Sequence, residues 1–142
     1  MAAWVYKCNN KKEWHGRTYI GDWQEFFDDH EKGIGTWGSV SVIPQLRELL
    51  PDDTIFAYQT ERNELVGLLR MVRLSGDRVK LKVVERLGVK VLRLRNANKR
   101  IAAIEAFKQG PKQTLRELSA SEAKLLLKES RLARDRSKDK GI

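Results

Sequence analysis

Few residues in this chain of 142 have side chains suited to covalent or metal chemistry. Its one cysteine, Cys8, cannot form an internal disulfide, and with only His15 and His30 beside it there is no zinc-ligand spacing. The chain also contains no nucleophile elbow, no P-loop and no paired carboxylates at catalytic spacing. We therefore expect a binding protein that is not an enzyme and that holds neither a metal nor a cofactor.

Trp37 is the first candidate for binding because of its unusual setting. It lies in GIGTWGSV (residues 33–40), a run of glycines and small residues that fits neither a regular helix nor a central strand. An exposed indole offers a flat face for a nucleic-acid base, and such stacking is worth about 1–3 kcal/mol per base. Gly35, Gly38 and Ser39 would let a nucleotide backbone approach closely. The alternative is that Trp37 anchors its loop in the core.

Positive charge is concentrated in one part of the chain. Residues 1–69 hold seven Lys or Arg against eleven Asp or Glu, whereas residues 70–100 hold eleven against two. In this second block the cations alternate with Val and Leu, so they would emerge on one face of a sheet if the block forms strands. We expect this strip from Arg70 to Arg100 to bind a polyanion, and the alternative is a merely solvated strand face.

The strands that would position these residues are indicated by β-prone segments. Residues 3–8 form the first, and a meander of four follows at 54–60, 65–74, 78–85 and 89–94, the last two on either side of Gly88. Polar turns separate most of these segments. A sheet made largely of sequential neighbours is therefore predicted.

Helices are predicted in four places. A helix over 21–33, with Asp22 as N-cap and Gly33 as its stop, follows from aromatic and histidine residues at helical spacing: Trp23, Phe26, Phe27 and His30. A short helix begins at Pro44, and another covers residues 98–107. The final helix starts from the capping box Ser119, Ala120, Ser121, Glu122 and runs through Arg136.

This order of elements is typical of an α+β fold, in which a small curled β-barrel is flanked by helices. We expect a single domain over residues 1–136, followed by a frayed tail over 137–142. No apolar run is long enough to span a membrane, and no signal-peptide core begins the chain. We therefore expect a cytoplasmic protein with no membrane partner.

Four segments in order resemble the EVE and YTH domains of the PUA-like superfamily. WVYKCNN (4–10) is similar to the IKSNN entry of YTH domains, and TWGSV (36–40) is similar to their VWST segment. Residues 52–72 resemble a hairpin common to both families, and residues 105–119 resemble the closing RDGQEI loop and its helix. The resemblance implies a PUA-like fold that binds nucleic acid and recognises a modified base flipped into an aromatic cage.

The resemblance also implies residues for this cage. The expected set is Trp37, Ser39, Asn9, Cys8, Trp14, Tyr58 and Glu85. Trp37 corresponds to one cage wall, and Asn9 would hydrogen-bond the base edge. The second cage tryptophan of YTH domains falls on Glu85 or Val84, so that wall is missing. Either another ring, from Trp14, Tyr58 or Tyr6, closes the pocket, or the site prefers a base other than methylated adenine, because a carboxylate at Glu85 could accept from a cytosine amine.

Phosphate contacts are expected from the lysine of the first motif and from the basic strip. The expected set is Lys7, Lys90, Arg93, Arg95, Lys99, Arg100, Lys108 and Lys112.

We therefore expect a reader of a methylated base in DNA or RNA, either as the targeting module of a modification-dependent restriction system, associated with a nuclease or motor subunit, or as a stand-alone reader. Two alternatives stay open. One is an amidohydrolase of modified nucleosides, related to ASCH domains, that would use Lys7, Glu85 and a threonine that the sequence does not identify. The other is a PUA-like RNA-binding module without a cage.

Overall fold

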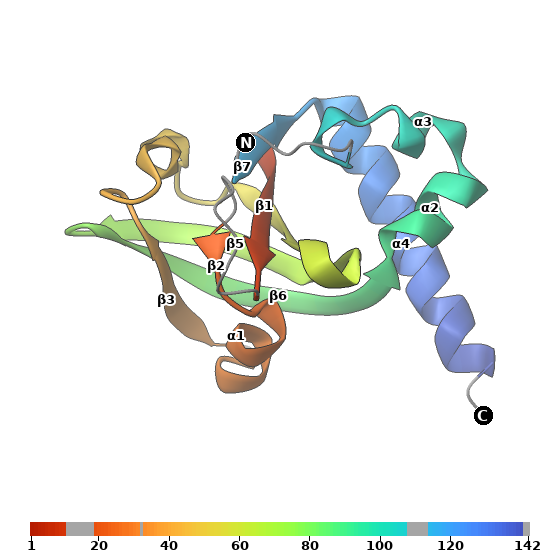
Figure 1. Ribbon diagram of the computed structural model, residues 1–142, viewed down its shortest axis with the longest axis horizontal. Helices are drawn as coiled ribbons and strands as arrows, with labels where there is room; N and C mark the ends of the chain where they lie inside the picture. Colours follow the sequence, from red (N-terminus) through yellow and green to blue (C-terminus); the bar gives the residue numbers. More distant parts are fainter. Residues whose placement is uncertain (11–18, 32, 108–113, 141–142) are drawn as a thin grey trace.

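The computed structural model describes residues 1–10, 19–31, 33–107 and 114–140 (Figure 1). Its strands are β1 (Ala3–Asn9), β2 (Tyr19–Ile20), β3 (Ile34–Ser39), β4 (Thr54–Gln59), β5 (Glu64–Ser75), β6 (Arg78–Lys90) and β7 (Leu115–Leu118). Its helices are α1 (Trp23–Asp29), α2 (Val91–Ala97), α3 (Lys99–Ala102) and α4 (Ala120–Lys140), with 3-10 turns η1 (Pro44–Glu48), η2 (Thr60–Arg62) and η3 (Glu105–Phe107). The strands form one sheet in the order β2-β1-β4-β5-β6-β3, and β7 also pairs with β1. The predicted α+β class is confirmed, with the strands forming a curled open sheet flanked by helices.

Two hydrophobic cores lie on opposite faces of this sheet, because successive residues of a strand point to opposite sides. On β1, Trp4, Tyr6 and Cys8 belong to one core, whereas Val5 belongs to the other. We call the first side the aromatic face, since α1 packs its aromatic side chains there. The side of Val5 is the helical face, because α2, α3 and α4 pack against it.

Helix α1 forms where the aromatic spacing predicts it. Trp23, Phe26 and Phe27 are buried, and the Asp22 side chain accepts a hydrogen bond of 2.9 Å from the backbone N–H of Gln24. Both the buried stripe and the N-cap are therefore confirmed. The helix ends at Asp29, earlier than the predicted stop at Gly33, because the next residue, His30, leaves the helical conformation.

The prediction of two strands around Gly88 is wrong. Strand β6 continues through Gly88, which adopts a φ of +62°, and ends at Lys90. Residues 91–97, which include most of the expected last strand, instead form α2. Val91 and Leu94 are three residues apart, so one helical face buries both of them in the core of the helical face. A cation–aliphatic repeat of this length fits both a strand and a helix, and packing decided in favour of the helix.

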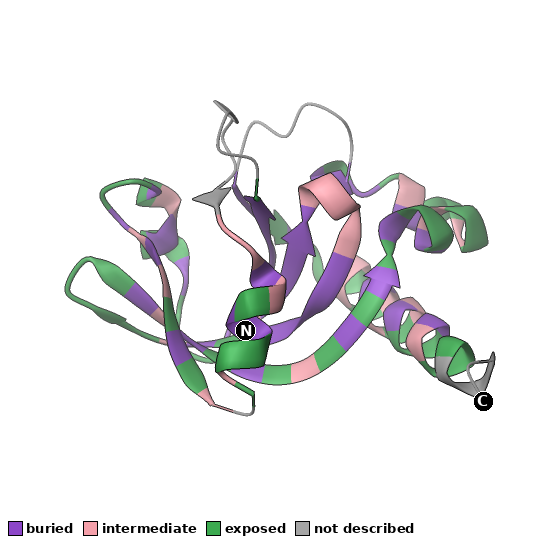
Figure 2. Cartoon of the chain, turned by 60° about the horizontal axis from the view of Figure 1, so that its bottom comes forward, coloured by how far each residue is buried: buried purple, intermediate pink, exposed green. Residues whose placement is uncertain are grey.

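Helix α4 begins at the predicted capping box. The backbone N–H of Ser119 donates to Glu122 Oε1 at 2.8 Å, and the backbone N–H of Glu122 donates to Ser119 Oγ at 3.1 Å, which confirms the motif. The helix continues past Arg136 to Lys140. In Figure 1 it lies with α2 and α3 at one end of the β5–β6 hairpin, while the hairpin tip extends away from all three. Figure 2 shows the alternation of buried and exposed residues along the strands of this hairpin.

Among the described helices, none is both long enough and apolar enough to cross a membrane.

Candidate nucleic-acid-binding site

Trp37 lies on an edge strand that is interrupted by a change of register. β3 is the last strand of the sheet and pairs only with β6 among the described strands. Its register shifts between Thr36 and Ser39, and Gly38 within this interval has a φ of +82°. A Cβ on Gly38 would lie 2.3 Å from the Tyr6 hydroxyl, so the close approach requires glycine here. The glycine-rich run therefore serves to bend the edge strand around Trp37.

The indole of Trp37 is half-buried and is held by three groups. It stacks on Trp23 with ring centroids 4.6 Å apart and an interplanar angle of 24°, and its edge meets Phe26. Its Nε1–H donates to Cys8 Sγ at 3.2 Å. Burial raises the pKa of the Cys8 thiol, so the sulfur acts here as a neutral acceptor. The ring is thus fixed at the border of the aromatic core, and its stacking on a base stays a prediction.

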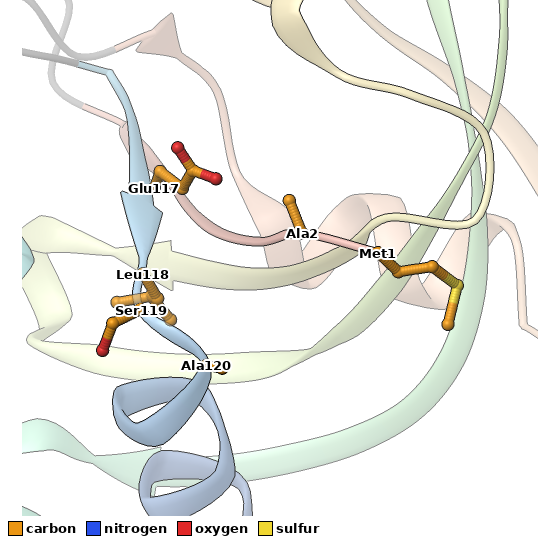
Figure 3. Close-up of a pocket in the computed structure, with 6 residues that line it drawn as sticks. All are labelled: Met1, Ala2, Glu117, Leu118, Ser119 and Ala120. Atoms are coloured by element: carbon orange, nitrogen blue, oxygen red, sulfur yellow. The ribbon is translucent and has the colours of Figure 1, made fainter.

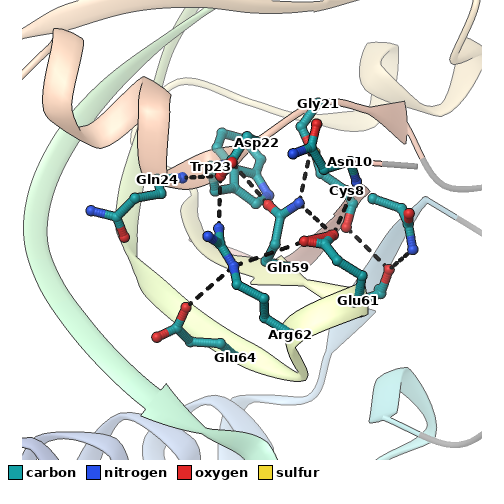
Figure 4. A network of polar contacts seen from close by, with 12 residues as sticks. Cys8, Asn10, Gly21, Asp22, Trp23, Gln24, Gln59, Glu61, Arg62 and Glu64 are labelled. Atoms are coloured by element: carbon teal, nitrogen blue, oxygen red, sulfur yellow. Dashed lines mark hydrogen bonds and ion pairs between the residues drawn. The ribbon is translucent and has the colours of Figure 1, made fainter. Parts of the chain in front are cut away.

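Asn9 follows Cys8 at the end of β1 and lies next to the polar network of Gln59 and Glu61 that Figure 4 shows. Its Nδ2 donates to Thr60 Oγ1 at 2.8 Å, and that hydroxyl donates to the Cys8 carbonyl at 3.1 Å. Nearby, the Gln59 side chain accepts from the Trp23 backbone N–H at 2.8 Å and donates to Glu61 at 2.7 Å. The network ties the end of β1, the start of α1 and η2 together. By the alternation of β1, Asn9 faces the side opposite Cys8, so its predicted place beside Trp37 is not borne out.

Lys7 does not share a face with Trp37. It points to the helical face beside Tyr58, its register partner on β4, whereas Cys8 points to the aromatic face. Lys7 is 2% exposed, and among the described residues no carboxylate forms an ion pair with it. Burial, together with the positive charge of Arg116, lowers the pKa of the Lys7 ammonium to about 8. The predicted phosphate contact of Lys7 stays a prediction, and its side chain lies on the face of the sheet opposite Trp37.

Tyr58 also lies on the helical face and does not form a wall beside Trp37. Its ring packs edge-on against Phe107 with centroids 5.3 Å apart, and its hydroxyl donates to Asn63 Oδ1. Burial raises the pKa of the Tyr58 phenol. Of the three rings that could close the cage, Tyr58 is turned away from Trp37 by the alternation of side chains along β4.

Glu85 is engaged by helix α4 and does not face Trp37. Its carboxylate pairs with Arg131 at 2.5 Å and with Arg134 at 2.7 Å. The hydrogen bonds from Arg131 hold the pKa of Glu85 below its usual range. The carboxylate thus fastens α4 to β6 and does not lie beside Trp37 as the cage prediction has it, whereas the alternative of an amidohydrolase that uses Lys7 and Glu85 stays a prediction.

Four predicted residues of the cage and the loop remain, of which the structure describes only Ser39. The Ser39 hydroxyl lies close to Trp37 in sequence but hydrogen-bonds to Asp77 and Ser41, and this contact fixes the bend of β3 to the hairpin tip. The other three, Trp14, Lys108 and Lys112, lie outside the described residues.

The remaining predicted phosphate ligands lie around α2 and α3. Lys90 donates to the Arg62 carbonyl at 2.8 Å, and Arg93 donates to Ser137 Oγ at 2.7 Å. The same region carries Arg95, Lys99 and Arg100. A second group of cations lies at the opposite end of the hairpin, in the distal halves of β5 and β6: Arg70, Arg73, Lys80 and Lys82. The sequence predicts the basic strip as a whole, but only the register of the hairpin identifies this second group.

An open cavity of about 530 Å³ lies at the β7–α4 junction (Figure 3). Its lining holds one carboxylate and no cationic side chain, and consists of Met1, Ala2, Glu117, Leu118, Ser119 and Ala120. Such a lining offers little to a polyanion, so we place the candidate site at Trp37 and the basic hairpin instead.

The curled sheet with its flanking helices is a PUA-like fold. No protein-family model matches the chain, and no curated protein matches it. The fold class is therefore assigned from similarity to solved structures, and this similarity extends over nearly the whole chain.

Three of these structures show the extent of the similarity. Protein Rpa0253 from Rhodopseudomonas palustris is 20% identical, with 93% of this chain and 94% of that chain covered and a TM-score of 0.67. A hypothetical protein from Leishmania major is 18% identical, with 92% and 95% covered and a TM-score of 0.67. Human THYN1, solved in complex with DNA containing 5-methylcytosine, is 12% identical, with 92% and 98% covered and a TM-score of 0.65. At these identities the similarity establishes a common fold.

Proposed function

We propose that this chain is a nucleic-acid-binding domain that reads a modified base, as an EVE- or YTH-like member of the PUA-like fold. The observation that carries the proposal is the setting of Trp37. Its indole is half-buried, stacked on Trp23 and hydrogen-bonded to Cys8 at the bend of an edge strand. A ring fixed in this way loses little conformational entropy when a base stacks on it. The THYN1 complex supports methylated cytosine in DNA as the first ligand to test.

The energetics set the size of the preference. Flipping a base out of a duplex costs a few kcal/mol, and stacking on an aromatic side chain returns about 1–3 kcal/mol. Burial of one methyl group adds only about 0.8 kcal/mol. We therefore expect a preference for the modified base of at most tens of fold, with phosphate contacts supplying most of the affinity.

We propose binding without catalysis. The engagement of Glu85 by Arg131 and Arg134 supports this, because a carboxylate held in two ion pairs is a poor general base. A neutral, buried Cys8 thiol is likewise a poor nucleophile. Such a domain would suit the targeting of a nuclease or motor subunit to modified DNA inside the cell.

The test is a binding titration with duplex and single-stranded oligonucleotides that carry 5-methylcytosine, N6-methyladenine or no modification. Wild type should prefer one modified form. Trp37→Ala should lose most of this preference but keep salt-sensitive binding, whereas Trp37→Phe, the matched control, should keep much of it because a stacking ring remains. A folded Trp37→Ala variant that discriminates as well as wild type would show that Trp37 is only a loop anchor.

A further inference from the structure

We propose that the sugar–phosphate backbone of the bound nucleic acid lies on the distal patch, defined as Arg70, Arg73, Lys80 and Lys82. This inference rests on the proposed function and adds a second contact surface to it. The patch is on the side of the sheet opposite Trp37, on the part of the hairpin that the helices leave uncovered (Figure 1).

The register of the hairpin puts like charges directly opposite each other. Arg70 is the partner of Lys82, and Arg73 is the partner of Lys80. Between these two pairs, Met71 and its partner on β6 point into the aromatic core, so all four cations emerge on the other side. Two cation–cation pairs on one face of a hairpin are mutually destabilising.

Nothing in the described part of the chain offsets this repulsion. No carboxylate among the described residues forms an ion pair with any of the four cations. Arg70, Arg73 and Lys82 are exposed, and Lys80 is half-buried. A polyanion laid across the two pairs would remove the repulsion and release its own counterions. The patch therefore has the charge and the openness that a phosphate backbone needs.

Apolar side chains beside the cations favour a nucleic acid over a small anion. Ile34 on β3 is the register partner of Lys82 and is 52% exposed, and Val84 is 42% exposed. Arg70 and Lys82, with Val83 and Val84, line a shallow cavity of about 320 Å³. Cationic and apolar groups side by side can contact phosphates and sugars of the same strand.

Strand β3 connects this patch to the candidate base site. Gly35 and Trp37 point toward the aromatic face, while Ile34 and Thr36 point to the side of the patch. Because β3 is the edge of the sheet, Lys80 and Lys82 on β6 lie one strand in from this edge, and Arg70 and Arg73 on β5 lie two strands in. A nucleic acid that presents a base to Trp37 can continue around this edge and place its backbone on the patch.

The experiment measures how binding to an unmodified DNA duplex depends on salt, for the wild-type protein, for a patch variant and for a control variant. The double variant Arg70→Gln/Lys82→Gln should lower the slope of log K against log salt by about 1.8, at about 0.9 for each phosphate that is no longer neutralised. Its preference for a modified base should stay at the wild-type value. Lys124→Gln/Lys128→Gln, which removes the same charge from α4, is the matched control and should leave the slope near that of wild type.

The outcomes separate this inference from the proposed function. A lowered slope in a protein without any base preference would support the patch and contradict the reader. An unchanged slope with base preference intact, or equal reductions of the slope in the patch variant and its control, would overturn the patch. Patch-dependent binding to phosphatidylserine vesicles without binding to nucleic acid would also overturn it. Thermal unfolding checks that the patch variant and its control are folded. Both should unfold at or above the temperature at which the wild-type protein unfolds.

Discussion

The two halves of the β5–β6 hairpin have the same alternation of cations and aliphatic residues but different surroundings. In the half next to the helices, Leu87 and Val89 are buried under α2 and α4, Arg86 pairs with Asp28, and Lys90 donates to a backbone carbonyl. In the distal half, the cations of the patch are without acidic partners among the described residues. Where helices cover the hairpin, this pattern therefore contributes to the core and to ion pairs. Where no helix covers it, the cations remain available for a ligand.

The largest expected effect on stability comes from substituting Gly67, which lies in the half next to the helices. Gly76, at the tip of the hairpin, is the comparison. A Cβ on Gly67 would lie 2.3 Å from the Phe27 ring and 2.5 Å from the Glu85 carbonyl oxygen, so Gly67→Ala should lower the free energy of unfolding by about 3 kcal/mol. At the hairpin tip nothing lies within 4 Å of a Cβ built on Gly76, whose φ is +61°. Gly76→Ala should cost only about 1 kcal/mol of backbone strain. Equal costs in urea denaturation would contradict the difference in packing between the two halves.

A buried and an exposed lysine should differ in the pH dependence of stability. The folded-state pKa of Lys7 is about 8, below that of the unfolded chain, so the unfolded state binds more protons between about pH 8 and 10.5 and stability rises over this range. Lys7→Met should raise the free energy of unfolding by about 2 kcal/mol at pH 7, and this gain should vanish near pH 10.5. Lys82→Met, in the exposed patch, should gain much less, because it relieves only repulsion between solvated charges. A Lys7→Met gain that persists at about pH 10.5 would contradict burial of the charge.

A smaller effect is expected from the carboxylate that holds α4. Because Arg131 and Arg134 depress the pKa of Glu85, its contribution to stability is present above the ordinary carboxyl pKa and is lost as pH falls through the folded value. Glu85→Gln should cost about 1 kcal/mol near neutral pH and nothing in strong acid. Thermal unfolding of both proteins from strong acid to neutral pH would measure this. A difference between them that is constant over the range would assign the effect to packing.

Local patterns predicted much of this fold. The aromatic spacing of α1, its Asp22 cap and the capping box at Ser119 depend on neighbours in sequence, and the structure confirms each of them. The alternation of β1 could also have separated Lys7 from Cys8, since adjacent strand residues face opposite sides.

The arrangement of side chains around the candidate site could be predicted from the sequence only in part. Register shifts in the β5–β6 pair, such as the one between Leu68 and Leu69, change which face a side chain occupies, and no residue type marks them. The partners of Glu85 are Arg131, 46 residues away, and Arg134, 49 residues away, so both ion pairs depend on the docking of α4. The opposed cations of the distal patch likewise follow from register rather than from composition.

The most direct test of this account is the ratio of the dissociation constants for unmodified and modified duplex, measured for the wild-type protein at low and at high salt. If Trp37 reads the base and the distal patch holds the backbone on the other side of β3, both affinities should fall together as salt rises. The preference should then stay constant, because counterion release is common to both ligands. A preference that disappears at the salt concentration where phosphate binding is abolished, or that is absent throughout, would contradict a separate base-reading site.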